Sequence, residues 1–341
     1  MLCLVFLLAR PAYALEFHAP EVPESGSEFM PDETQSFAEG LWSIIKEGIV
    51  HIKPSFAQSA GICFSVSMCV ILCSIVKAFP GAQCKAVELV GTILLGFLLL
   101  QPSNAMIHLG TDTIKEISNY GKLLFPVLTA ALAASGGVTQ SAALYAGAVA
   151  VNTAFTSMIS SILVPTVYVY LCLAVVSGAI NNQYLEKIKS FIKWLTTWGL
   201  KLVLYAFGAF MSLSGVITGA VDSNALKATK LAISGLVPVV GSILSDASET
   251  VLISASLVRN SAGVYGLFAV LSIWIGPFIR IGTQYLLLKL TWSFCEVFST
   301  KETCKLIGDF SSAMGLILGM TGTVCVLLLI SIVCFMKGVG G

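Results

Sequence analysis

Charged side chains are scarce in this sequence. Only 11% of its 341 residues are Asp, Glu, Lys or Arg, whereas an average soluble domain carries about 25%. So few charges cannot solvate the surface of a globular protein of this size, and 56% of the residues are hydrophobic. The formal net charge is +1 with no basic stripe, which argues against a nucleic-acid partner. The composition favours an integral membrane protein whose first partner is the lipid bilayer.

Motifs for catalysis and for metal or cofactor binding are also lacking. The three histidines, His18, His51 and His108, lie far apart, so they suggest neither a metal site nor a catalytic triad. The sequence contains no P-loop, no GxSxG and no HExxH. We therefore expect no catalytic residue, no cofactor, no resident metal and no enzyme activity.

The ten cysteines do not form the pattern of a disulfide framework. Most lie inside apolar runs, where a thiol behaves as a small hydrophobic group. Cys69 and Cys73 share a helical face and Cys84 follows them, but no CxxC and no nearby histidine supports a metal site. Cys295 and Cys304 are the best candidates for a disulfide, on position alone.

The first residues predict export. Residues 1–14 contain an apolar core followed by Ala12-Tyr13-Ala14, a small-x-small pattern typical of a signal peptide cleaved after Ala14. No Lys or Arg precedes the core, so either the true start lies upstream or the signal is weak. Residues 15–55 should be an exported acidic linker, since eight of the eighteen acids lie between Glu16 and Glu47. Apolar residues at helical spacing within 32–52 predict a short amphipathic helix on the membrane or on a partner; the alternative is a solvated linker with one marginal helix.

From residue 56 onward apolar segments dominate and predict an all-α polytopic membrane protein with roughly seven to nine spans. The domain organisation expected is a transmembrane bundle over 56–220, an amphipathic helical hairpin over 221–262 and a C-terminal transmembrane segment over 263–341. Several spans are short or contain proline, so we expect kinked or half-spanning helices. The spans and the prolines that interrupt them are 56–78, 86–109, 123–135, 142–164, 165–180, 200–220, 263–281 and 312–336, with Pro102, Pro126, Pro165 and Pro277.

Basic residues orient these spans. Lys77 and Lys85 bracket one short loop, and four lysines crowd 187–201, which the positive-inside rule places in the cytoplasm. With an exported N-terminus, both signals agree if four crossings separate them. The lysine segment itself has an interfacial character, because Trp194 and Trp198 suit the headgroup region.

The segment over 221–262 is less apolar and carries the candidate functional residues. Gly235, Pro238 and Gly241 form a natural hinge between two amphipathic helices, which together suggest a re-entrant or interfacial hairpin. Ionisable residues at membrane depth usually face a bundle interior or water, so we place function here. The alternative is that these side chains lie at headgroup depth and only orient a surface hairpin. The predicted polar surface comprises Lys227, Lys230, Asp246, Glu249 and Arg259.

Two GxxxG patterns offer weaker evidence for helix packing. Gly215 and Gly219 form one, and Gly315 and Gly319 form the other. Such spacing lets helix backbones approach closely, although thirty glycines make chance matches common.

Several of these residues together resemble the stage III sporulation protein AE family. The resemblance covers nearly the whole chain, and its most specific part is the block from Pro238 to Ala247. It is carried by Phe125-Pro126-Val127-Leu128, Ala134-Ser135-Gly136-Gly137, Lys230, Val237-Pro238-Val239-Val240-Gly241, Leu244-Ser245-Asp246-Ala247, Thr250-Val251-Leu252, Asn260 and Gly263.

The resemblance implies a role in endospore formation. Proteins of this family are components of a secretion-like channel or feeding tube that links mother cell and forespore and supports forespore development and late forespore gene expression. It further implies the mother-cell membrane around the forespore as location, and as partners the other proteins of the stage III sporulation A operon and a forespore-made channel protein. The competing interpretation is a secondary transporter or permease that holds a small solute near the membrane midplane. No convincing repeat of the flanking residues relates the two halves, as such a transporter would require.

Overall fold

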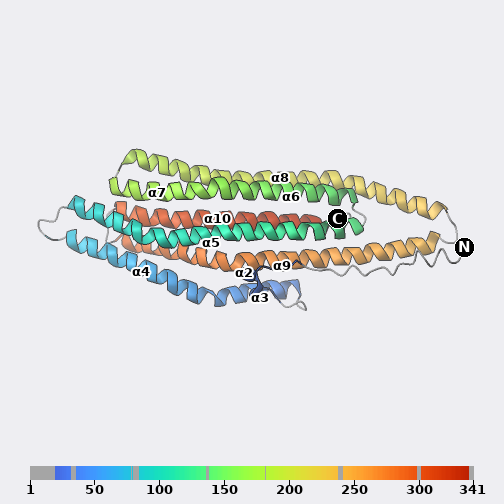
Figure 1. The fold of residues 1–341 in the computed structure, drawn as a ribbon, viewed down its shortest axis with the longest axis horizontal. Helices are drawn as coiled ribbons and strands as arrows, with labels where there is room; N and C mark the ends of the chain where they lie inside the picture. The colour runs from blue at the N-terminus through green and yellow to red at the C-terminus, as the bar shows by residue number, and fades with distance from the viewer. Residues whose placement is uncertain are drawn as a thin grey trace.

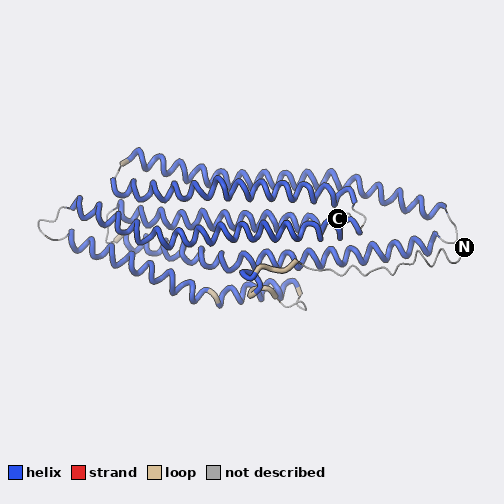
Figure 2. The backbone as a smooth tube through the Cα atoms, in the orientation of Figure 1, coloured by secondary structure: helices blue, strands red, loops and turns tan. Residues whose placement is uncertain are grey.

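The computed structural model describes the backbone of residues 20–31, 36–77, 79, 84–135, 138–180, 182–236, 241–297 and 301–337. The side chains are described for the same residues except 84–85, 138–140, 143, 211–259 and 301. Within these ranges the protein contains helices and no strand (Figure 2), which confirms the all-α prediction.

In the described part of the chain ten helical elements follow one another, and most of them run side by side in an elongated bundle (Figure 1). Four of them are between 37 and 55 residues long. The elements are α2 (Glu24–Ser27), α3 (Phe37–Val50), α4 (Ile52–Lys77), α5 (Cys84–Ala134), α6 (Val138–Met158), the π-helical turn η1 (Ile159–Leu163), α7 (Val164–Ile180), α8 (Gln183–Leu236), α9 (Gly241–Cys295) and α10 (Lys301–Lys337).

The two ends of the bundle differ. At one end, called the loop end here, α4 is followed by α5, α7 by α8 and α9 by α10 (Figure 1). At the opposite end α8 and α9 extend past the other helices, and this is called the hairpin end (Figure 1). A helix of 54 residues is about 80 Å long, so α8 greatly exceeds the roughly 30 Å hydrocarbon core of a bilayer.

Among the described residues, five helical stretches are long and apolar enough to cross a membrane. They show a polytopic membrane protein, and the expected total of seven to nine spans stays a prediction. The five stretches are Phe37–Lys77, Ala86–Ala134, Leu144–Ile180, Asn260–Cys295 and Glu302–Lys337.

Segments expected as separate spans are joined in the structure. The expected spans 86–109 and 123–135 are parts of one helix, α5, because the polar stretch between them stays helical and buries Ile107, Ile114 and Ile117. Likewise 142–164 and 165–180 form the continuous run α6–η1–α7. Two helical runs, not four, therefore separate the loop at Lys77 from the lysine segment. Each helical run carries the chain from one end of the bundle to the other, so two runs return it to the end where it started. Both basic segments therefore still lie at the same end of the bundle (Figure 1).

The prolines do not interrupt the helices where breaks were expected. Pro102 and Pro126 lie inside α5, and Pro277 lies inside α9. A proline removes one backbone hydrogen bond, but neighbouring helices can hold the chain helical in spite of that loss. At Pro165 the adjustment is visible, since η1 directly precedes it and Val164 N–H donates to Ile159 O, five residues back. A π-helical turn of this kind accommodates local distortion without ending the helix.

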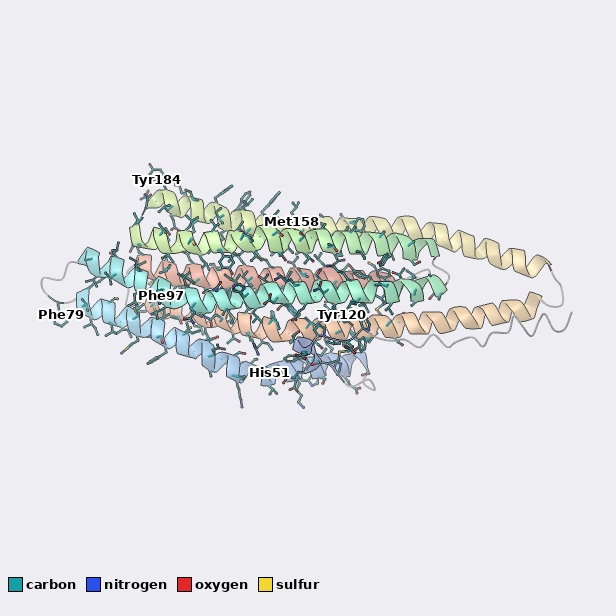
Figure 3. All side chains as sticks on the ribbon, viewed as in Figure 1. His51, Phe79, Phe97, Tyr120, Met158 and Tyr184 are labelled. Carbon is teal, nitrogen blue, oxygen red and sulfur yellow. The ribbon has the colours of Figure 1, made fainter. Side chains whose placement is uncertain are left out.

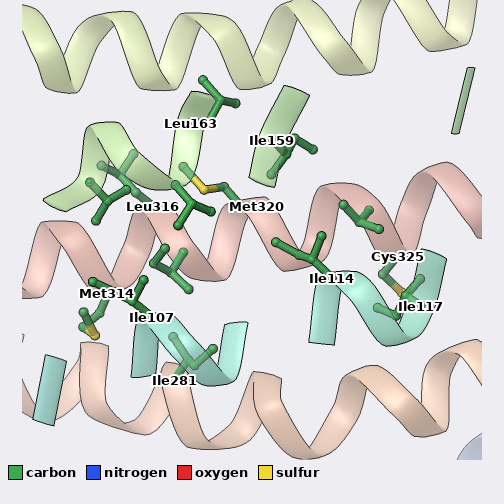
Figure 4. Packing of buried hydrophobic residues seen from close by; sticks show 14 of the residues in the cluster. Ile107, Ile114, Ile117, Ile159, Leu163, Ile281, Met314, Leu316, Met320 and Cys325 are labelled. Carbon is green, nitrogen blue, oxygen red and sulfur yellow. The ribbon is translucent and has the colours of Figure 1, made fainter. Parts of the chain in front are cut away.

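The core lies where α5, α9 and α10 pack together. Ile107, Ile281 and Met314 meet there, one from each helix, and all three are fully buried (Figure 4). Close approach of α5 to α10 depends on glycine, because a Cβ on Gly110 would collide with Ile317 and a Cβ on Gly121 would lie 2.8 Å from Leu328. This packing fixes the axial register of the three helices.

The N-terminal segment packs on the outside of α9. Ser36 and Glu39 form a capping box that starts α3, and one face of α3 contacts α9 through Gly40, Ile44 and Gly48. A Cβ on Gly40 would lie 2.6 Å from Phe268, and one on Gly48 would lie 2.9 Å from Ile279. The short helix expected within 32–52 is thus present as α3, and it lies along another helix of the same chain.

Candidate functional site

A charged cleft of about 770 Å³ opens between α7, α8, α9 and α10 near the loop end. Its walls combine small residues of α7 with acidic and basic residues of α8 and α10, with Trp292 of α9 and with Glu296, which follows the end of α9. The lining residues are Ala174, Ser177, Gly178, Asn182, Gln183, Glu186, Lys187, Lys189, Trp292, Glu296, Glu302, Cys304, Lys305, Leu306 and Asp309.

Lys189 is the central charge of this charged cleft. Only 3% of its side chain is exposed, and its Nζ pairs with Asp309 of α10 and with Glu186, at 2.8 Å, one turn back on α8. Burying an ammonium group without partners would be very costly, so the two carboxylates account for its position. Lys305 Nζ lies 3.3 Å from the other oxygen of Glu186, which extends the network to the rim of the cleft.

Asp309 also connects to α7. The Tyr170 hydroxyl donates to Asp309 Oδ1 at 2.7 Å, and Lys189 Nζ lies 3.5 Å from Ser177 Oγ, also on α7. Three helices are therefore joined by one network in which each charged group has a partner. One turn further along α8, Lys193 Nζ donates to Ser312 Oγ of α10 at 2.9 Å. The network holds α7, α8 and α10 in register at the loop end.

The electrostatics of the cleft favour the ionised form of Glu186. Burial acts to raise the pKa of this carboxyl group, but hydrogen bonds and charge attraction from Lys189 and Lys305 outweigh it, so its pKa is lowered. A carboxylate paired on both sides in this way stays charged across the physiological range. The cleft thus presents fixed charges of both signs and can bind polar or charged groups at its rim. Across the described residues, no group of three or more His, Cys, Asp or Glu side chains could hold a metal ion.

Sequence reasoning missed this cleft. The lysines of 187–201 predicted only the topology of the chain, and no motif indicated a site at Asp309. The hydrophobic faces of the lysine segment predicted a helix, but nothing local indicates that Lys189 turns inward toward a carboxylate 120 residues away. A weak signal was available, because Asp309 begins a long apolar run and an acid at membrane depth requires a partner.

The predicted polar surface falls on the parts of α8 and α9 that reach the hairpin end. The side chains of Lys227, Lys230, Asp246, Glu249 and Arg259 lie outside the described residues, so whether they face one another stays a prediction. Of the predicted hinge, Gly235 is in the last turn of α8, Gly241 is the first residue of α9, and Pro238 lies outside the described residues.

The structure describes the surroundings of one of the two GxxxG patterns, that of Gly315 and Gly319. A Cβ on Gly315 would lie 3.2 Å from Tyr285 of α9, and a Cβ on Gly319 would lie 3.2 Å from Leu200 of α8, so both glycines face neighbouring helices. Gly215 and Gly219 are helical, but their surroundings lie outside the described side chains. Cys295 and Cys304 are both buried, where α9 ends and α10 begins, and their pairing stays a prediction.

Long apolar helices, basic segments at one end and a charged cleft near them define an α-helical polytopic membrane protein. Comparison with known proteins makes this more specific. A family model described as stage III sporulation protein AE matches residues 31–338, so the chain belongs to the stage III sporulation protein AE family, and the family implies a role in sporulation.

Among curated proteins, the chain is similar to the stage III sporulation protein AE of Bacillus subtilis (strain 168). The two are 24% identical over 224 residues, which cover 65% of this chain. The match spans 56% of that relative's length, a little over half. No solved structure matches the chain.

Proposed function

We propose that this protein is a membrane component of a secretion-like channel or feeding-tube complex that links mother cell and forespore during endospore formation. In this role it supports forespore development and late forespore gene expression. Its place is the mother-cell membrane that surrounds the forespore, and its partners are the other proteins of the stage III sporulation A operon and a channel protein made in the forespore.

The observation that carries the proposal is the family match over residues 31–338. The architecture agrees with it, because a component of a membrane conduit needs helices that cross a bilayer and polar surface that a partner can reach. Five helical stretches in the described part of the chain meet the first requirement. The segments 221–236 and 241–262, which extend α8 and α9 at the hairpin end, are the candidate for the second (Figure 1).

The polar surface of Lys227, Lys230, Asp246, Glu249 and Arg259 is the proposed contact to the complex or its conduit. These residues carry charges of both signs, so they suit a protein partner that also has both signs more than a uniformly charged ligand. Because α8 and α9 carry them beyond the other helices, a partner could approach them without displacing the bundle.

The test is the double substitution Asp246→Ala and Glu249→Ala in the full-length chain in a sporulating host. The expected result is a drop in heat-resistant spores of at least tenfold, with unchanged protein level in the membrane fraction. The matched control is the double substitution Glu21→Ala with Glu24→Ala. It also removes two carboxylates that are three residues apart, and both of these residues are exposed. Normal spore yield of the Asp246 and Glu249 variant at normal protein level would overturn the proposed surface.

Partner identity is tested separately with a photo-crosslinking residue at 227, 230, 246 or 249. The proposal expects adducts with products of the stage III sporulation A operon or with the forespore channel protein. A crosslinker at Asp112, which is exposed on α5, serves as the control position. Crosslinks from all four hairpin positions to lipid alone would contradict the role in the complex.

A further inference from the structure

Exposed apolar side chains are not spread evenly along the bundle. Near the loop end, the outer faces of α4, α5 and α7 expose large apolar residues, including Phe64 at 73% and Phe97 at 76%. Figure 3 shows Phe79, Phe97 and Tyr184 at this end. The set, called the apolar belt here, comprises Phe56, Phe64, Met68, Leu72, Ile75 and Val76 of α4, Leu89, Val90, Ile93, Leu94, Phe97 and Leu100 of α5, and Val169, Val176 and Ile180 of α7 with Ile162 of η1.

Contacts between the helices show that these residues share one axial level. A Cβ on Gly91 of α5 would lie 2.8 Å from Cys73 of α4, and a Cβ on Gly96 would lie 3.0 Å from Val175 of α7. The apolar faces of the three helices therefore form one continuous surface and not three separate patches.

Beyond the apolar belt the outer surface changes character. On α5 the continuous set of exposed large apolar residues ends at Leu100, and Asp112 and Lys115 follow with side chains that are 64% and 63% exposed, before one further exposed leucine, Leu123. On α6 the exposed positions that the structure describes are small or polar apart from Tyr145, and they are Ala142, Ala146, Ala150, Thr153, Ala154 and Ser157. The α5 surface at Asp112 and Lys115 does not suit hydrocarbon, because exposed ionised groups at membrane depth are strongly disfavoured.

The charged part of α5 lies beside the central part of α9. Gly110 contacts Ile281, and Leu124 contacts Gly266, so 110–124 of α5 run antiparallel to 281–266 of α9. The same stretch of α9 packs against α3, because Gly40 lies next to Phe268 and Gly48 lies next to Ile275. A whole section of the bundle, with α2, α3 and the second half of α5, thus lies beyond the apolar belt.

The dimensions of the apolar belt match a bilayer. From Phe56 to Val76 on α4 the rise is about 30 Å, and from Ile162 to Ile180 it is about 27 Å. The hydrocarbon core of a bilayer is about 30 Å thick. The cationic side chains of the same region suit the adjoining headgroups, since Lys77 lies at the loop end and Lys187 and Lys305 line the charged cleft that opens there. Lysine side chains at such positions reach toward the interface.

We infer that the bilayer surrounds only the loop-end part of the bundle, at the apolar belt, and that the remaining part projects from the membrane on the exported side. The basic loop end faces the cytoplasm by the positive-inside rule. From Tyr205 near the outer edge of the membrane to Leu236, α8 then extends about 45 Å. The tip of α8 and α9 therefore stands well clear of the lipid.

The inference does not depend on the proposed role in sporulation, and it is tested by thiol labelling on one helix. Phe97→Cys and Asp112→Cys are introduced separately into the full-length chain. Each variant is produced in cells, and the cells are converted to sealed protoplasts. A membrane-impermeant maleimide is added, and labelling above that of the unsubstituted chain is measured. Both wild-type side chains are exposed on α5, so neither substitution disturbs packing, and labelling after denaturation confirms that each new thiol is present.

The expected result is that Asp112→Cys reacts at least tenfold faster than Phe97→Cys in protoplasts. Equal rates at the two positions would overturn the placement of the bilayer. Reaction of Asp112→Cys in inverted vesicles only would overturn the exported side. A second pair checks the lipid contact directly: Phe97→Arg should lower the amount of membrane-inserted protein several-fold, while Asn119→Arg, also exposed on α5, should leave it unchanged.

Discussion

Lys189 of α8 and Asp309 of α10 form an ion pair across 120 residues of sequence, and only 3% of the lysine side chain is exposed. Glu186 and Tyr170 complete the surroundings of this pair. The pair joins two helices that the connectivity alone does not bring together. The ion pair therefore determines how the helices pack at the loop end. Single substitutions of its residues should change the free energy of unfolding most.

Asp309→Ala should lower the free energy of unfolding by about 3 kcal/mol, because it leaves Lys189 buried with fewer partners. Thermal melting of the detergent-purified protein measures the change. Lys305→Ala removes a largely exposed partner of Glu186 and should cost less than about 1 kcal/mol. The double variant Lys189→Met with Asp309→Leu should be more stable than Asp309→Ala, because it buries no unpaired charge. If it is less stable, burial of the unpaired Lys189 charge does not explain the loss of stability in Asp309→Ala.

The stability of the loop end should depend on pH through Glu186. Its pKa is lowered in the folded protein by Lys189 and Lys305 from the ordinary value of 4.5. A lowered carboxyl pKa contributes stability that is fully present above about pH 4.5 and is lost as the pH falls through the folded value. Melting temperatures between pH 6 and pH 3 should fall more steeply for the wild type than for Glu186→Gln. Parallel curves would show that Glu186 does not contribute.

Gly110→Ala should destabilise the core, because the added Cβ would collide with Ile317 where α5 approaches α10. Overpacking of this kind costs about 1–3 kcal/mol. Gly282→Ala on α9 is the matched control, since no atom lies within 4 Å of the Cβ it would add. Because alanine favours helix more than glycine does, that control should be neutral or stabilising by up to about 1 kcal/mol. Equal melting temperatures for the two variants would contradict the close approach.

Phe29→Ala should release α2 from α9. Phe29 is buried, its carbonyl accepts a hydrogen bond from Ser272 Oγ at 3.1 Å, and its ring packs against Gly276. Loss of a buried phenylalanine ring costs about 3 kcal/mol or more, which is enough to detach a four-residue helix. Hydrogen exchange over residues 20–31 should become at least tenfold faster, whereas Phe56→Ala, at an exposed position on α4, should leave it unchanged.

Parts of this architecture could be predicted from residues alone because they depend on local chemistry. Apolar runs predicted helices, and apolar residues at helical spacing within 32–52 predicted the helix that the structure shows as α3. Pro102 and the polar residues after it indicated a break between the expected spans 86–109 and 123–135, yet both lie in the single helix α5. In the folded chain, Ile107, Ile114 and Ile117 bury one face of that same stretch, so packing overrides the local signal.

The sequence by itself determined the class of protein and the placement of its basic segments at a common end, because scarce charges and long apolar runs act through solvation, which needs no knowledge of contacts. Only the tertiary structure decided that Lys189 pairs with Asp309, that α3 lies against α9, and that the exposed apolar faces of α4, α5 and α7 meet at one level of the bundle. These three features join residues that are far apart in the chain, and their register depends on close packing at positions such as Gly110. The free energy of a buried charge depends on which groups surround it, and only the folded bundle supplies those groups.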